Sequence, residues 1–149
     1  MTLKQKIFSH YRQVLNEKIS SLQLVLSDLK ESGANETKST AGDKHETALA
    51  MLQIEQANTR GQLKEVVDQR NLFDRIDPSI SSGVIVNGSL IKTNRGWLFL
   101  SVAAGKAIVD GNTVIALSPQ SPLGQKLMGK REGDGVEVNN TRYVIETVG

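Results

Sequence analysis

Apolar residues recur at seven-residue intervals along the first part of the chain. Two sets of residues make the pattern, one at the interval itself and one between its members: Phe8, Leu15, Leu22 and Leu29, then Tyr11, Ile19, Val25 and Leu26. This period is typical of a helix that packs against another helix. The pattern predicts one helix of about 30 residues, followed by a loop of small and polar residues at 31–42.

A second apolar stripe predicts a helix from about Asp43 to Phe73. The stripe is made by Leu49, Leu52, Leu63, Val66 and Phe73. Its middle is weaker, because Gln56 and Thr59 fall on the same side of the helix. Two long helices joined by a short polar loop predict an antiparallel helical hairpin.

Short apolar runs separated by turn residues replace the helical pattern after residue 75. Turns are predicted at Asn87-Gly88, around 94–96, at Asp110-Gly111 and at Asn139-Asn140. The residues of 97–100 alternate between aromatic and leucine, so one pair, either Trp97 with Phe99 or Leu98 with Leu100, is expected to face the core.

One short helix is predicted within this second part. Ser121 is expected to be its N-cap, Pro122 its first residue, and Gly129 its end. Pro78, in the stretch DRIDPSISSG, marks the boundary between the two parts. The predicted fold is therefore α+β: an antiparallel coiled-coil hairpin at residues 1–77, then a small antiparallel β-sheet domain with one short helix at residues 78–149.

Composition limits the function classes. The 18 basic and 16 acidic residues leave a net charge of +2, which argues against a nucleic-acid binder that works by bulk electrostatics. The absence of cysteine excludes disulfides and thiolate chemistry and suits a cytoplasmic protein. No apolar stretch reaches membrane-spanning length, so no membrane partner is expected. His10 and His45 lie far apart, which argues against a zinc site built from them.

The segment GDKHET (42–47) joins the two predicted helices and carries two carboxylates. Asp43 and Glu46 are three residues apart, so on a helix they share one face. Carboxylate oxygens at a helix N-terminus stabilise the helix dipole, which is one interpretation. They are also suitable ligands for Mg²⁺, which often takes only one or two protein carboxylates. The residues alone leave both interpretations open.

Two motifs resemble those of the bacterial Gre transcript-cleavage factors. The string SPLGQKLMGKREGDGVEV (121–138) resembles the signature of their FKBP-like C-terminal domain, and GDKHET resembles their acidic hairpin tip. The stretches EQANTRGQLKEV and IDP fall where that family has its second helical arm and its interdomain linker. The resemblance extends over most of the chain.

The resemblance implies a factor that assists RNA polymerase and is not itself an enzyme. In that family the β domain docks at the rim of the polymerase's secondary channel and the hairpin enters the channel. The hairpin then acts on the RNA 3′ end indirectly, through the polymerase's active centre. Asp43 and Glu46 would then complete a Mg²⁺ site at the polymerase's active centre, so that backtracked RNA is hydrolysed. No cofactor is expected in isolation, and no small-molecule substrate.

The resemblance also suggests which residues of the C-terminal motif dock on the polymerase: Ser121, Pro122, Leu123, Gly124, Lys126, Lys130 and Arg131. A second interpretation applies to the three cations, because basic residues at the end of a helix complement its dipole.

Three positions depart from the family's tip. Lys44 replaces an apolar residue, Thr47 replaces an asparagine, and Ala50 stands where an aromatic residue is expected. A regulator that occupies the same channel without cleavage is therefore an alternative function. Two others from different classes are a prolyl isomerase or chaperone, since FKBP-like folds host that activity, and a helical adaptor without chemistry.

Overall fold

The computed structural model describes the backbone of residues 1–36 and 42–149 and the side chains of residues 1–34 and 46–149. The chain forms two compact units. We call Val14–Arg70 the hairpin unit, and Met1–Gln13 together with Asn71–Gly149 the sheet unit. No helix in the described ranges is long and apolar enough to cross a membrane.

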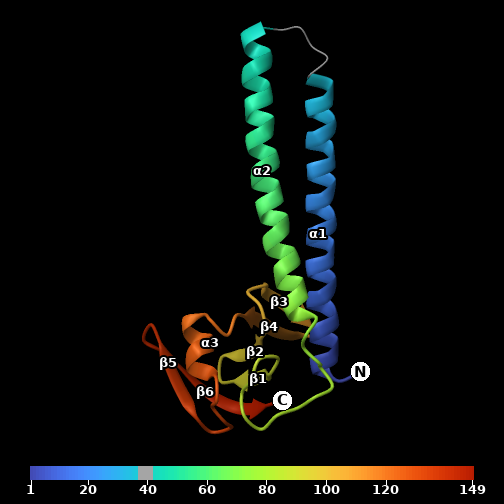
Figure 1. The fold of residues 1–149 in the computed structure, drawn as a ribbon. Helices are drawn as coiled ribbons and strands as arrows, with labels where there is room; N and C mark the ends of the chain where they lie inside the picture. The colour runs from blue at the N-terminus through green and yellow to red at the C-terminus, as the bar shows by residue number, and fades with distance from the viewer. Residues whose placement is uncertain (37–41) are drawn as a thin grey trace. The chain divides into compact units, whose positions relative to one another are not determined.

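The hairpin unit consists of parts of two long helices, α1 (Leu3–Glu36) and α2 (Gly42–Phe73). Their arms lie side by side and antiparallel (Figure 1). The Gln56 side-chain amide donates to the Leu29 carbonyl oxygen at 3.2 Å, so a polar residue of the predicted stripe crosses the seam. Thr59 is buried there as well. The predicted helical hairpin is confirmed.

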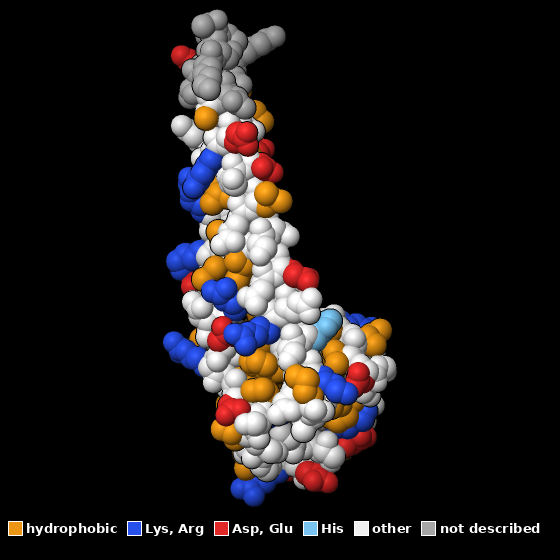
Figure 2. Space-filling model, turned by 90° about the vertical axis from the view of Figure 1, so that its right-hand side faces the viewer, with side chains coloured by type: hydrophobic (Ala, Val, Ile, Leu, Met, Phe, Trp, Pro, Cys, Tyr) orange, Lys and Arg blue, Asp and Glu red, His pale blue; other side chains and the backbone are white. Residues whose placement is uncertain are grey.

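Two details of the hairpin prediction are wrong. Residues 31–36, predicted as loop, continue α1 to Glu36. Val25, predicted in the apolar stripe, is 46% exposed, whereas Leu22, Leu26 and Leu29 are only partly exposed. The stripe continues at spacings of four and three residues, and Val25 lies one residue, or about 100°, away from Leu26 on the helix. Along the arms, charged side chains of both signs lie among apolar ones (Figure 2).

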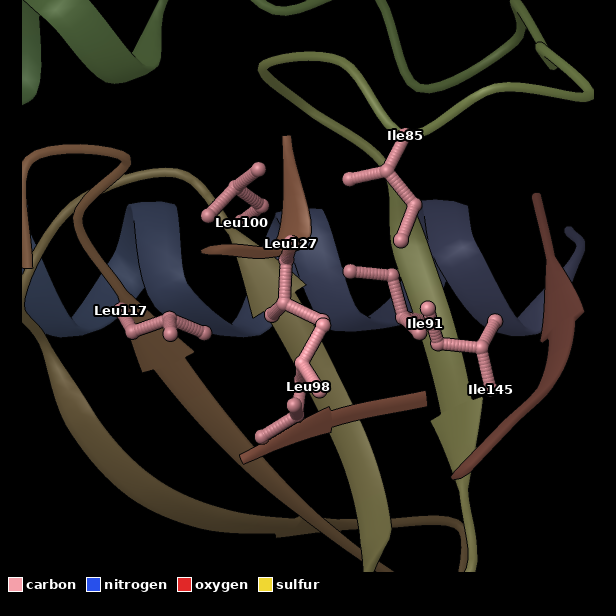
Figure 3. Close-up of a cluster of buried hydrophobic side chains, with 8 residues drawn as sticks. Ile85, Ile91, Leu98, Leu100, Leu117, Leu127 and Ile145 are labelled. Atoms are coloured by element: carbon pink, nitrogen blue, oxygen red, sulfur yellow. The ribbon is translucent and has the colours of Figure 1, made fainter. Parts of the chain in front are cut away.

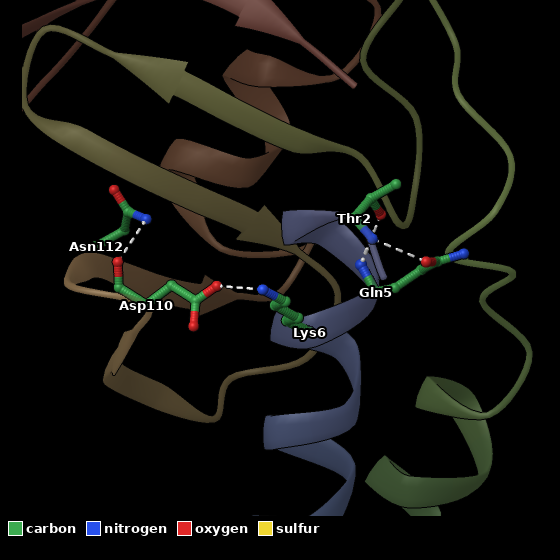
Figure 4. Close-up of polar contacts among 5 residues, drawn as sticks. All are labelled: Thr2, Gln5, Lys6, Asp110 and Asn112. Carbon is green, nitrogen blue, oxygen red and sulfur yellow. Dashed lines mark hydrogen bonds and ion pairs between the residues drawn. The ribbon is translucent and has the colours of Figure 1, made fainter.

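The first turn of α1 is held by a reciprocal cap between Thr2 and Gln5. The Gln5 backbone N–H donates to Thr2 Oγ1 at 3.2 Å, and the Thr2 N–H donates to Gln5 Oε1 at 2.9 Å (Figure 4). This is the capping box of a Thr followed three residues later by a Gln, which satisfies two backbone donors.

The sheet unit contains a single six-stranded sheet in the order β3-β4-β2-β1-β6-β5. The strands are β1 (Leu90–Thr93), β2 (Gly96–Leu100), β3 (Gly105–Val109), β4 (Asn112–Leu117), β5 (Gly135–Val138) and β6 (Thr141–Val148). All neighbours pair antiparallel except β2 and β4, which are parallel. After β2 the chain moves to the sheet edge, forms β3 in the reverse direction and returns as β4. Two reversals therefore bring β4 parallel to β2.

Two predicted hairpin turns are confirmed by their backbone angles. Asp110 and Gly111 join β3 to β4 with φ of 51° and 76°, and Asn139 and Asn140 join β5 to β6 with φ of 51° and 62°. Consecutive positive φ values are those of a type I′ turn, which Asn, Asp and Gly adopt at the lowest cost.

Side chains are buried on both faces of the sheet. One face carries a cluster that includes Leu98, Leu100 and Leu117 together with Leu127 from the short helix α3 (Pro122–Leu127) (Figure 3). On the opposite face Phe99 meets Phe73 edge-to-face, with ring centroids 5.9 Å apart. The expectation that one alternate pair along β2 faces the core is confirmed for Leu98 and Leu100. Phe99 is buried as well, because the ends of the long helices cover the second face.

The compact units do not follow the predicted domain boundary after residue 77. The first turns of α1 and the last residues of α2 belong to the sheet unit. Aromatic packing accounts for this: Phe8 stacks on Phe73 at 4.6 Å between ring centroids, and Tyr11 lies 6.4 Å from the Phe99 ring. The linker around Pro78 separates the two parts in sequence, but the helix ends pack with the sheet.

Polar contacts tie the same helix start to the β3–β4 hairpin. The Tyr11 hydroxyl lies 2.7 Å from the Gly105 carbonyl oxygen and 3.2 Å from that of Val114. Burial raises the pKa of Tyr11, so this hydroxyl stays protonated and able to donate. Lys6 pairs with Asp110 at 2.6 Å (Figure 4). The beginning of α1 is thus fixed to the sheet by burial and hydrogen bonds together.

Candidate functional site

The acidic tip lies at the beginning of α2. This helix begins at Gly42, so Asp43 and Glu46 both fall in its first turns, three residues apart on one helical face. The Asp43 side chain is outside the described residues, as are those of Lys44 and His45. Glu46, Thr47 and Ala50 are exposed. The carboxylate of Glu46 is therefore accessible to another molecule.

The donor set at the tip suits a hard cation but does not complete a site. Among the residues whose side chains are described, no group of three or more His, Cys, Asp or Glu residues could hold a metal ion. Mg²⁺ needs about six oxygen ligands in octahedral geometry. Two helical carboxylates supply a minor share of them, so Asp43 and Glu46 fit Mg²⁺ only where water and a second molecule supply the rest.

The C-terminal motif begins with a tightly built helix start. Ser121 is the N-cap of α3: its Oγ accepts from the Gly124 N–H at 3.0 Å and donates to the Ser118 carbonyl oxygen at 2.7 Å. Pro122 occupies the first turn and is exposed, while Leu123 packs against the buried cluster. The predicted N-cap and first helical residue are confirmed.

Gly124 is required by close backbone approach. A Cβ at this position would lie 2.1 Å from the Ser118 carbonyl oxygen. The Ser-Pro-Leu-Gly part of the motif therefore builds a compact turn, and within it Pro122 is the residue most open to a partner.

We predict that Gly124→Ala destabilises the sheet unit by about 1–3 kcal/mol, as is typical of an added methyl group in a closed space. The backbone carbonyl group of Ser118 must move to make room for the methyl group. Thermal unfolding measures the effect. Gly129→Ala is the comparison variant. Gly129 has φ of 80° and nothing within 4 Å of its Cβ position, so this substitution measures the cost of a positive φ without a steric clash. Equal unfolding temperatures for Gly124→Ala and the parent chain would contradict this account.

The second part of the motif also forms a turn. The Arg131 backbone N–H donates to Asp134 Oδ2 at 2.9 Å, and the Ile145 N–H donates to the Asp134 carbonyl oxygen at 2.9 Å. Gly133 between them has φ of 90°. The Gly-Asp of the motif therefore fixes the loop that leads into β5, an edge strand of the sheet.

Two of the three predicted basic residues line one groove. Lys126 and Lys130 line the same groove between α3 and β5, together with Gln125, Met128, Gly135 and Val136. Arg131 is not part of its lining. Sequence analysis missed the uncharged lining residues. The alternation of Val136, Glu137 and Val138 predicts a strand at these residues, but it does not predict that the strand lies beside the short helix.

Comparisons with known proteins give one curated relative. No protein-family model matches the chain. The transcription elongation factor GreA of Jannaschia sp. (strain CCS1) is 32% identical over 88 residues, which are 56% of this chain and 54% of that protein. The chain thus spans about half the length of the curated relative that it matches.

Among solved structures, one described as the structure of the transcription factor Gfh1 aligns over 92% of both chains, with 15% identity and a TM-score of 0.37. At this level the likeness adds no argument to the sequence match. The resemblance to the Gre transcription elongation factors that the sequence motifs indicate is confirmed by the match with the curated GreA.

Proposed function

We propose that this chain is a transcription elongation factor of the Gre type. It binds bacterial RNA polymerase in the cytoplasm, places its hairpin in the secondary channel and stimulates cleavage of backtracked RNA. One observation carries the proposal: a helical hairpin with two carboxylates at the start of its second arm occurs in the same chain as the 121–138 motif. The curated relative, which is named as a transcription elongation factor, supports it.

The chain's part in the reaction is to deliver carboxylates. Asp43 and Glu46 would hold a Mg²⁺ ion whose other ligands come from water and the polymerase, and that ion would lower the pKa of a bound water and stabilise charge on the reacting oxygens. The two arms of the hairpin fix the helix on which both carboxylates lie, since Gln56 joins α2 to α1. The polymerase supplies the RNA and the rest of the active centre, so the chain alone is not an enzyme.

We expect the purified chain to bind RNA polymerase of its own organism and to shorten RNA in stalled, backtracked elongation complexes. Binding is measured by co-sedimentation or fluorescence anisotropy, and cleavage by the length of labelled RNA. RNA that stays intact with the chain, as without it, would exclude the cleavage activity. No binding to the polymerase would exclude the whole proposal and leave an adaptor or an isomerase to be tested.

A second candidate is a regulator that occupies the channel without cleavage. The observation that favours it is the tip sequence, where Lys44, Thr47 and Ala50 differ from the pattern that the tip otherwise resembles. A cation at position 44 adds a positive charge close to Asp43 in the chain, and a positive charge there disfavours a nearby metal cation. Binding to the polymerase with unaltered RNA length identifies this candidate.

A further inference from the structure

A pocket in the sheet unit lies between the first turn of α1 and the segment that links α2 to β1. Its volume is about 200 Å³. Lys4 of α1 lines it, and its other lining residues all come from residues 75–89. Every one of them belongs to the sheet unit. The pocket shares no lining residue with the groove between α3 and β5 and contains no residue of the acidic tip, so it is a separate feature of the molecule.

Hydrogen bonds and close packing fix the walls of this pocket. The Lys4 ammonium donates to the Ile80 carbonyl oxygen at 2.6 Å, and the Gly88 N–H donates to the Leu100 carbonyl oxygen at 2.6 Å. Gly88 has φ of 94°, and a Cβ there would lie 2.9 Å from Cγ2 of Ile76. The backbone at Gly88 therefore packs directly on the Ile76 side chain. The pocket exists without rearrangement of the backbone.

The charged groups of the pocket leave one positive charge over. Arg75 is exposed, and its guanidinium has no hydrogen bond or ion pair with any residue that the structure describes. Asp77 is already engaged, because its Oδ1 accepts from the hydroxyl and from the backbone N–H of Ser79. These hydrogen bonds lower the pKa of Asp77, so the carboxylate stays ionised. The cations of Arg75 and Lys4 face one carboxylate, which favours a ligand with a single negative charge.

Lys4 is poorly compensated where it lies. Burial lowers the pKa of Lys4, and the opposing effect of the Asp77 charge is smaller. The ammonium has therefore lost hydration that Asp77 does not fully replace. Only one of its three donors goes to the Ile80 carbonyl oxygen. An anion in the pocket would accept from the other donors and stabilise the charge.

Apolar side chains lie beside these cations. Ile76, Ile80 and Val86 line the pocket, and Ile80 and Val86 are 63% and 44% exposed. Ligand pockets typically combine apolar walls with a few polar groups, and those for drug-sized molecules measure about 300–1,000 Å³. This smaller pocket suits a smaller molecule, with an anionic end and a short apolar end.

We propose that the pocket between α1 and residues 75–89 binds a small monocarboxylate with a short hydrocarbon chain. Arg75 and Lys4 hold the carboxylate, since the planar guanidinium matches its two oxygens. The chain of the ligand contacts Ile76, Ile80 and Val86. The inference goes beyond the proposed function and does not depend on it, because the chain alone is tested.

The first test compares three small molecules on the full, isotope-labelled chain by NMR. Valerate should shift the amides of Ile76, Asn87 and Ser89 and saturate them in the millimolar range. Amylamine, which has the same chain length with a cation in place of the carboxylate, should give no saturating shift. Inorganic phosphate, which lacks the apolar end, should bind more weakly than valerate. No shifts with valerate, or equal binding of amylamine, would overturn the inference. Tighter binding of phosphate would overturn the monocarboxylate as occupant.

The second test removes the cation that the fold does not use. Arg75→Gln should weaken valerate binding about tenfold, because a charge-assisted pair is lost. The matched control is Lys106→Gln, which neutralises an exposed cation of the same unit outside the pocket and should change the affinity less than twofold. Equal affinities of Arg75→Gln and the parent chain would contradict the assignment.

Thermal unfolding gives an independent readout of the same site. Saturating valerate should raise the unfolding temperature of the parent chain and of Lys106→Gln, because a ligand that binds only the folded state stabilises it. The rise should be smaller in Arg75→Gln and in Lys4→Gln, which removes the second cation. A rise of the same size in all four chains would mean that valerate acts elsewhere, and the pocket would be rejected as its site.

Discussion

Asp43→Asn and Glu46→Gln should each lower the rate of RNA cleavage more than tenfold, which corresponds to at least about 1.4 kcal/mol in the activation free energy. Each substitution keeps the shape of the side chain and removes one of the two carboxylates that the tip offers to Mg²⁺. A metal ion left with one donated carboxylate is held less well, so fewer complexes are active. Labelled RNA in a backtracked complex measures the rate.

Three further readouts separate metal binding from folding and docking. Helix stability should change by no more than about 0.3–1 kcal/mol, the usual contribution of a charge near a helix N-terminus. Affinity for the polymerase should stay close to that of the parent, because the predicted docking residues lie at 121–131. A higher Mg²⁺ concentration should restore part of the activity, since mass action refills a weakened site.

The matched control for the tip is Glu55→Gln, an exposed carboxylate on the same helix. It removes the same charge from the same arm, three turns further along, and should leave cleavage unchanged. Cleavage at the parent rate in both Asp43→Asn and Glu46→Gln would mean that the two carboxylates only cap α2. The non-cleaving regulator would then be the better account.

Periodicity predicted the helices well because their burial follows a simple repeat. Leu15, Ile19 and Val66 are buried where the stripe places them. The helix ends were harder to predict, since residues 31–36 have small and polar side chains yet remain helical. Their helical state depends on continuation of a helix already formed, which costs less than starting one, and composition alone does not report it.

Turn chemistry was equally predictable from single residues. Asp110-Gly111 and Asn139-Asn140 require positive φ at both positions, and few residue pairs tolerate it. By contrast, the parallel pairing of β2 with β4 depends on where the intervening strand β3 attaches to the sheet. Nothing local in the sequence specifies that attachment.

The candidate site was predicted in part, for the same physical reasons. The Ser121 cap and the Pro122 start are local, so the sequence identifies them. The sequence does not show that Lys130 lines the groove while Arg131 does not, because the groove depends on how α3 packs beside β5. The seven-residue stripe also could not show that Phe8, Tyr11 and Phe73 cover a sheet face rather than the hairpin seam. That distinction requires the tertiary structure.

The second large effect is expected at the junction of α2 with the sheet. Phe73→Ala should destabilise the sheet unit by about 3–5 kcal/mol, the usual cost of deleting a buried aromatic side chain. Phe73 is fully buried, stacks on Phe8 at 4.6 Å and meets Phe99 edge-to-face at 5.9 Å. Since domains are typically stable by only about 5–15 kcal/mol, chemical denaturation should show a much lower midpoint.

The neighbouring residue provides a control within the same helical turn. Leu72 is 52% exposed, so Leu72→Ala removes a similar apolar group from the surface and should cost about 0.5 kcal/mol or less. Hydrogen exchange adds a local readout: in Phe73→Ala the amides of β2 around Phe99 should exchange faster, because the rings that cover this strand lose their central member. Similar denaturation midpoints for the two variants would mean that the helix ends do not stabilise the sheet. A large difference would mean that residues 78–149 need the helix ends for their stability and are not an independent domain. Deletion of residues 78–149 would in turn expose Phe73, Tyr11 and Ile7, which are buried in the intact chain.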